Sequence, residues 1–201
     1  MNRPNPSAVD SASELSAALI PRSAELATDI YGLIVKEIPA LHGDSRVLTL
    51  LEASVAENVS TMLHILQHGI DLERVRAPAA AEEYAWRLAQ HGVPVAALLR
   101  AYRIGSARFE EWCLAELGRR TDSASVVSAT GMRIAGTLNA YIDRVSEEVL
   151  GAYELEKRNG CGTRARPAPL VSAPCCGTSS RTWPPPKPFS ATGCGSTTWA
   201  S

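Results

Sequence analysis

The sequence predicts an all-α protein: a single bundle of five or six helices with a long C-terminal helix, followed by a disordered tail. Apolar residues recur at i, i+3 and i+4 spacing in segment after segment, and none shows the strict alternation of a strand. Prolines and glycines stand where these segments begin and end. We expect a disordered lead over residues 1–10, the helical domain over 11–158 and the tail over 159–201.

Three helices are expected in the first half of the domain. Ser11 or Ser13 caps a short helix that runs to residue 20, and a second helix opens at Pro21 and ends before Pro39. The third, after a cap at Asp44 or Ser45 and before a stop at Gly69, is the most regular. Its apolar positions keep helical spacing over five turns: Leu48, Leu51, Val55, Val59, Met62, Leu63 and Leu66.

The fourth and fifth helices each begin at a proline. Pro78 opens a shorter helix that ends at Gly92, with three side chains inside: Tyr84, Trp86 and Leu88. Pro94 opens the next, which Gly118 stops. Its apolar stripe contains small residues at 105 and 106, which indicates that another helix crosses closely there.

The last helix is the longest. Asp122 or Ser123 caps it, and it stays strongly helical to about Lys157 before Pro-, Gly- and Cys-rich sequence follows. A helix that reaches the edge of a domain in this way commonly leads into a further domain or a dimer seam. We therefore expect a homodimer through this helix.

Composition excludes several classes of protein. The chain of 201 residues carries 20 basic and 21 acidic residues, so it is neither a strongly basic nucleic-acid binder nor an acidic tail. No stretch approaches the roughly 18 continuous apolar residues of a transmembrane helix, and the N-terminus lacks the apolar region of a signal peptide. We expect a soluble cytoplasmic protein without a membrane association.

Catalytic and metal-binding patterns are weak. His64 and His68 stand four residues apart on one helix and could face one metal, but no carboxylate accompanies them at helical spacing. His42 and His91 are single and adjoin glycines that end helices, and Cys113 lies on an apolar face as a small hydrophobe would. We predict no enzyme, no metal and no cofactor.

The densest local pattern is YAWRLAQHGVPVAALLRAYRIGSARFEEW, residues 84–112. Its arginines could form a site for an anion or a partner protein, or they could be part of an exposed helix face with weak charge pairs. The candidate interaction or signature residues are Arg100, Tyr102, Arg103, Gly105 and Trp112.

A resemblance to a known family rests on three stretches: HGVPVAALLRAYRIGSARFEEW, the preceding YAWRLA and the final YELEK. They resemble the RsbRD-type N-terminal domain that begins many actinobacterial PucR/CdaR-type transcriptional regulators. The resemblance covers roughly residues 14–157. It implies a sensory or protein-interaction role without catalytic residues. It also implies that a GGDEF-like domain and a DNA-binding helix-turn-helix would normally follow, so this chain without them should not bind DNA.

The tail departs from that pattern. Residues 160–201 contain no acidic residue. They contain seven of the thirteen prolines and four of the five cysteines of the chain. Back-translated with mostly G- or C-ending codons and read in another frame, residues 182–200 become LAAAEAVLGYRLRQHHL, which is similar to the start of the GGDEF-like domain. We predict a frameshift, with a natural disordered tail as the alternative.

Three functions therefore compete. The first is the sensory and dimerisation module of a PucR/CdaR-type regulator that lacks its later domains. The second is a stand-alone protein-interaction component of a stress-response pathway, which would have a signalling protein as its partner. The third is a helical sensor that binds haem or another small ligand.

Overall fold

Six α-helices and three short 3-10 helices make up the part of the chain that the computed structural model describes, residues 8–164, with side chains described through residue 160. The elements are α1 (Ala8–Leu19), η1 (Ile20–Arg22), α2 (Ser23–Glu37), η2 (Pro39–Leu41), α3 (Ser45–His68), η3 (Leu72–Arg74), α4 (Ala79–Gln90), α5 (Val95–Arg120) and α6 (Ala124–Arg164). No strand occurs in these residues. The predicted all-α class and the long C-terminal helix are confirmed.

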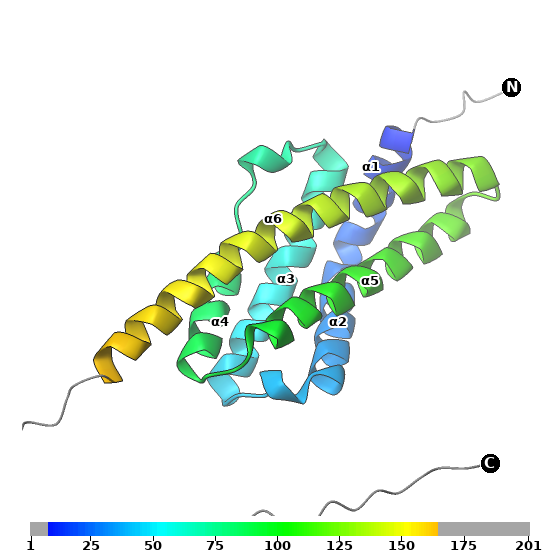
Figure 1. Cartoon of the computed structure of the whole chain (residues 1–201). Coiled ribbons are helices and arrows are strands. Elements are labelled where there is room, and N and C mark those ends of the chain that lie inside the picture. The colour runs from blue at the N-terminus through cyan, green and yellow to red at the C-terminus, as the bar shows by residue number, and fades with distance from the viewer. Residues whose placement is uncertain (1–7, 165–201) are drawn as a thin grey trace, which may run out of the picture. The chain divides into compact units, whose positions relative to one another are not determined.

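The helices pack around one continuous hydrophobic core. α3 packs against α1, α2 and α4, while α6 packs against α1, α4 and α5, and α2 also packs against α5. Figure 1 shows α6 crossing the bundle diagonally, with α5 close to it near the turn that joins them and diverging from it toward the other end of α5. None of the described helices is long and apolar enough to span a membrane.

Local capping explains where the central helices begin and end. The Asp44 carboxylate accepts a hydrogen bond from the Val47 N–H (3.0 Å), which is the predicted N-cap of α3. At the other end, Gly69 adopts the left-handed conformation with φ of 61°, as the predicted stop requires. α6 begins directly after Ser123, whose carbonyl accepts from the Val127 N–H (3.0 Å).

Two predicted helix boundaries are wrong. α1 begins at Ala8, so the predicted disordered lead over residues 1–10 is too long; residues 1–7 lie outside the described residues. α5 continues through Gly118 to Arg120, because one glycine costs a helix only about 1 kcal/mol and Glu116 pairs with arginines beyond it.

Trp86 was predicted to be buried, and this is also wrong, since its exposed fraction is 41%. Tyr84 and Leu88, four residues apart, share the buried face of α4, with exposed fractions of 1% each. Each residue turns the helix by about 100°, so a residue midway between them faces nearly the opposite way.

Polar contacts fasten the second half of α6 to the segment around α4. Arg144 Nε donates to the Val75 carbonyl (2.7 Å), and Glu148 Oε2 accepts from the Ala77 N–H (2.7 Å). The Tyr153 hydroxyl donates to the Val93 carbonyl (2.7 Å). Beyond these contacts α6 continues to Arg164, past the predicted domain end at residue 158. The rest of the predicted tail lies outside the described residues.

Candidate functional site

The five predicted signature residues lie on α5 but fall into three environments. Arg100 and Arg103 are exposed, and neither makes an ion pair within residues 8–160. Tyr102 and Gly105 are half-buried and line an internal cavity. Trp112, one helical turn or more away, takes part in a separate polar cluster with α2. The structure therefore does not gather these five residues into one site.

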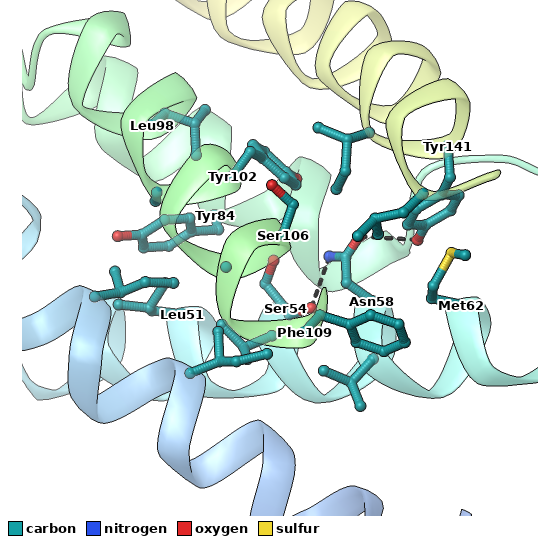
Figure 2. Close-up of a pocket in the computed structure, with 18 residues that line it drawn as sticks. Leu51, Ser54, Asn58, Met62, Tyr84, Leu98, Tyr102, Ser106, Phe109 and Tyr141 are labelled. Carbon is teal, nitrogen blue, oxygen red and sulfur yellow. Dashed lines mark hydrogen bonds between the residues drawn. The ribbon is translucent and has the colours of Figure 1, made fainter. Parts of the chain in front are cut away.

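The cavity lies between α2, α3, α4, α5 and α6 and has a volume of about 70 Å³ (Figure 2). Most of its lining is apolar: Ile30, Ile34, Leu51, Val55, Val59, Met62, Leu98, Ala101, Phe109, Leu138 and Ile142. Polar atoms come from Ser54, Asn58, Tyr84, Tyr102, Ser106 and Tyr141. An apolar pocket with a few polar groups is the usual form of a small-molecule site.

The sequence predicted that another helix crosses close to the small residues of α5, and in the structure this helix is α2. A methyl group placed on Gly105 would meet Ile30 Cγ2 at 3.4 Å and Ile34 Cδ1 at 3.9 Å, which are ordinary packing distances. The approach therefore does not require glycine. Small side chains at 101, 105 and 106 occupy less volume than the surrounding helices enclose, and the cavity is the result.

One side of the cavity has a complete hydrogen-bond chain. The Tyr141 hydroxyl of α6 donates to Asn58 Oδ1 of α3 (2.8 Å), and Asn58 Nδ2 donates to the Ser54 carbonyl (2.7 Å) (Figure 2). These two hydrogen bonds link Tyr141 of α6 to α3 at the wall of the cavity. Anything that displaces Asn58 would therefore act on α6.

Tyr84 differs from Tyr141 in having no partner. Both side chains are 1% exposed, yet the Tyr84 hydroxyl has no hydrogen-bond partner among the described residues. A buried hydroxyl left without a partner costs about 1–3 kcal/mol. Figure 2 draws Tyr84 beside Leu51 and Leu98, at one side of the cavity, and Tyr141 beside Met62 at the other.

The polar groups of the cavity are uncharged. Desolvation raises the pKa of Tyr84, of Tyr102 and of Tyr141 above the usual value for a phenol, so all three hydroxyls remain protonated at neutral pH. No Asp, Glu, Lys, Arg or His is among the described residues that line the cavity. A charged molecule inside it would therefore lack a counter-charge.

Asp29 organises the second cluster, which joins α2 to α5. Its carboxylate accepts from Arg108 Nε (2.7 Å), Arg108 Nη2 (3.2 Å) and Trp112 Nε1 (2.6 Å). Arg22 stacks its guanidinium over the Trp112 ring at 4.8 Å. Hydrogen bonds from Arg108 foremost, and from Trp112, hold the pKa of the Asp29 carboxyl below its usual value. Arg108 also pairs with Glu111 (2.7 Å), so its guanidinium already has two carboxylate partners. The cluster is therefore a contact between α2 and α5 and not an open anion site.

The histidines and Cys113 do not contribute to the cavity. All four histidines are exposed, and His64 and His68 stack on the surface with ring centroids 6.1 Å apart. The described residues contain no group of three or more potential metal ligands among His, Cys, Asp and Glu. Burial raises the pKa of the Cys113 thiol to about 12, so this thiol is unreactive at neutral pH.

Sequence reasoning missed the polar residues that shape the cavity. Tyr84 was predicted only as a core position of its helix, and Tyr141, Asn58 and Asp29 were not singled out as site residues. Asn58 and Tyr141 are 83 residues apart, as are Asp29 and Trp112, so no local spacing pairs them. A polar residue on a predicted buried stripe was the only available signal, and Asn58 provides it.

The fold defines the class of protein: an all-α domain with a largely apolar cavity between its helices and a long final helix. The chain belongs to the family described as the RsbT co-antagonist protein rsbRD N-terminal domain, which it matches over residues 24–166. The predicted resemblance to the RsbRD-type N-terminal domain is thereby confirmed, and the chain contains a regulatory helical domain of a signalling family. No curated protein and no solved structure matches the chain.

Proposed function

We propose that this chain is the non-catalytic input module of a PucR/CdaR-type transcriptional regulator, in which a separate helix-turn-helix domain would bind DNA. Its membership in the RsbRD family supports this role. The observation that carries the proposal is α6, one helix from Ala124 to Arg164 that packs against α1, α4 and α5 and is long enough to connect this bundle to a following domain. The module would act in the cytoplasm and would not bind nucleic acid itself.

The output would pass along α6. The helix is held to the α4 segment through Arg144, Glu148 and Tyr153, so we expect a shift of the α4 segment to move α6 with it. After Tyr153 its side chains are largely exposed, and Leu155 is a large hydrophobe with an exposed fraction of 53%. A homodimer formed through this end of α6 would cover Leu155 and hold two following domains in register.

A second function is favoured by one surface feature. Arg100 and Arg103 project from the exposed face of α5 without ion pairs among the described residues, and the family description names a co-antagonist of another protein. The chain could therefore act alone as a stress-pathway component, with an acidic signalling protein as its partner. Such a partner would bind less well to an R100E/R103E variant.

Sequencing the gene from codon 150 through several hundred bases past the stop separates the two functions. An alternative frame that stays open into a GGDEF-like segment and a helix-turn-helix supports the regulator and the frameshift. A frame that closes quickly contradicts both, and the stand-alone protein then becomes the better proposal.

Light scattering on the full chain tests the homodimer. We expect a dimer mass that Leu155→Glu reduces to the monomer mass, because the charge would be buried in the seam. Met132→Glu is the matched control, since Met132 is 69% exposed on the same helix at its other end and should leave the dimer intact. A monomeric wild type, or equal loss in both variants, would contradict a seam at the end of α6.

A further inference from the structure

We infer that Ser54 of α3 is the polar anchor of a ligand site in the cavity: its hydroxyl bonds to the one hydroxyl or carbonyl group of a small, uncharged molecule with an apolar body. In the proposed function such a molecule would be the input signal, so the physiological meaning of the inference rests on that proposal. The binding itself depends only on the cavity and is tested separately.

Ser54 is a buried polar residue whose hydroxyl lacks a partner. Its exposed fraction is 6%, and its backbone carbonyl accepts from Asn58 Nδ2 (2.7 Å). The hydroxyl itself makes no hydrogen bond within residues 8–160. The hydroxyls of Tyr84 and Thr130 also lack a partner in this part of the chain, but the protein encloses them completely. The Ser54 hydroxyl is not enclosed in this way, so a ligand can reach it.

The position of Ser54 on α3 directs it into the cavity. Leu51 lies three residues before it and Asn58 four residues after it, so the three share one face of the helix, and all three line the cavity. Figure 2 shows the Ser54 hydroxyl pointing from α3 toward Ser106 on α5, among the lining residues, whereas the Tyr84 hydroxyl points away from them. Ser54 is therefore the unpartnered hydroxyl that faces the space.

The size of the cavity limits the ligand to about one ring. A water molecule needs roughly 10–15 Å³ of cavity volume, so a cavity of about 70 Å³ has room for a molecule about as large as five to seven waters. A benzene ring with one substituent is in this range, whereas a haem is far larger. All four histidines are exposed, so none of them is available as a haem ligand in the cavity.

The lining determines the chemistry of the ligand. Most of its side chains are aliphatic or aromatic, which favours an apolar body. No charged side chain is among the described residues that line the cavity, so a carboxylate or an ammonium group would be buried without a counter-charge. A hydroxyl or a carbonyl group can pair with Ser54, because a serine hydroxyl both donates and accepts.

Ser54 also lies beside the contact that links α3 to α6. Asn58, whose amide donates to the Ser54 carbonyl, accepts from the Tyr141 hydroxyl of α6 (2.8 Å). A ligand held by Ser54 therefore lies next to this link, and its occupancy would bias the position of the helix proposed to carry the output. Ser106 and Ile142 are half-buried lining residues of α5 and α6, and a ligand would enter between them, where the two helices diverge (Figure 1).

Phenol and toluene are a matched pair of probes, because they have nearly the same size and differ in one hydroxyl. Ligand-detected NMR titrations on the full chain measure both affinities. We expect both probes to bind the wild type and benzoate not to bind. Ser54→Ala should weaken phenol binding about tenfold, because the phenol hydroxyl would then be buried without a partner, and should change toluene binding by less than about twofold.

Ser16→Ala is the matched control. Ser16 is also a buried serine, but its hydroxyl bonds to the Ala12 carbonyl (2.9 Å) and it does not line the cavity, so both affinities should stay unchanged. Ser106→Leu places a larger side chain where the ligand enters and should abolish binding of both probes. The melting temperature of free Ser54→Ala should equal or exceed that of the wild type, because alanine is the better helix former and no hydrogen bond is lost.

A phenol affinity that survives Ser54→Ala, or a wild type that binds toluene but not phenol, would overturn the assignment of Ser54. Failure of both probes to bind the folded wild type would overturn the ligand site itself. Neither result affects the dimer and gene-sequence tests of the proposed function. Conversely, a monomeric chain in which Ser54→Ala selectively weakens phenol binding would support the ligand site and contradict the proposed seam.

Discussion

The two halves of α5 have different packing although both carry the same apolar periodicity. In the first half, Val95–Ser106, the buried residues are Leu98 and Ala101, and the helix borders the cavity. In the second half, 107–120, Phe109 still lines the cavity, but Cys113 and Leu117 are buried away from it, and Arg108 bonds to Asp29 of α2. Apolar spacing therefore determines which face is buried, while side-chain volume determines whether that face is filled.

Truncating one leucine in each half gives the largest expected effect. Leu117→Ala should reduce the free energy of unfolding by about 3–4 kcal/mol, because a fully packed leucine leaves a new cavity. Leu98→Ala should cost only about 2 kcal/mol, because its side chain already borders empty space and loses fewer contacts. Urea denaturation of both variants measures the difference. Equal losses would show that the first half is as well packed as the second.

The Asp29 cluster gives an intermediate effect that depends on pH. Asp29→Asn should cost about 1–2 kcal/mol at pH 7, since it removes charge-assisted bonds to Arg108 and Trp112 that are partly exposed. The lowered pKa of Asp29 stabilises the folded state above the unfolded pKa of about 4, and this contribution is lost as the pH falls through the folded value.

Denaturation of the wild type and Asp29→Asn between pH 7 and pH 2 checks this sign. The gap between the two proteins should be largest at neutral pH and should shrink as the pH falls. A gap that stays constant or widens in acid would mean that the Asp29 carboxylate does not stabilise the contact between α2 and α5.

The smallest expected effect on stability comes from a substitution in the half of α5 that borders the cavity. Gly105→Ala should stabilise the protein by about 0.5–1 kcal/mol, because alanine is the better helix former and its methyl group would meet Ile30 at 3.4 Å. Gly32→Ala is the matched control, since it lies within α2 and a methyl group there meets no neighbouring atom. A thermal melt in which only Gly105→Ala is destabilised would show that α2 approaches α5 more closely than these distances imply.

Part of the fold followed from short-range patterns. The Asp44 cap, the Gly69 stop and the apolar stripe of α3 depend on residues within a few positions of each other, and all three appear in the structure as predicted. Trp86 and Gly118 show the limit of such reasoning. Trp86 was assigned to the core although its helical position faces outward. Gly118 was taken as a stop, but the helix continues to Arg120, where arginines pair with Glu116.

The candidate site was predicted less well than the fold. Among the signature residues, Tyr102 and Gly105 do line the cavity, but they were selected as part of a dense sequence pattern and not for facing a cavity. Tyr84, Asn58 and Tyr141 come from three different helices. Their positions around one cavity depend on how α3, α4 and α6 cross, which no local spacing encodes.

The sequence by itself determined the all-α class, the long final helix and the family, because periodicity, caps and the α5 signature are local properties of the chain. Only the tertiary structure decided that Tyr141 has a partner and Tyr84 has none. Both are buried tyrosines on apolar stripes, and a hydrogen bond requires a second group within about 3 Å. The cavity between them was decided in the same way, since enclosed volume is a property of all the helices together and not of any one segment.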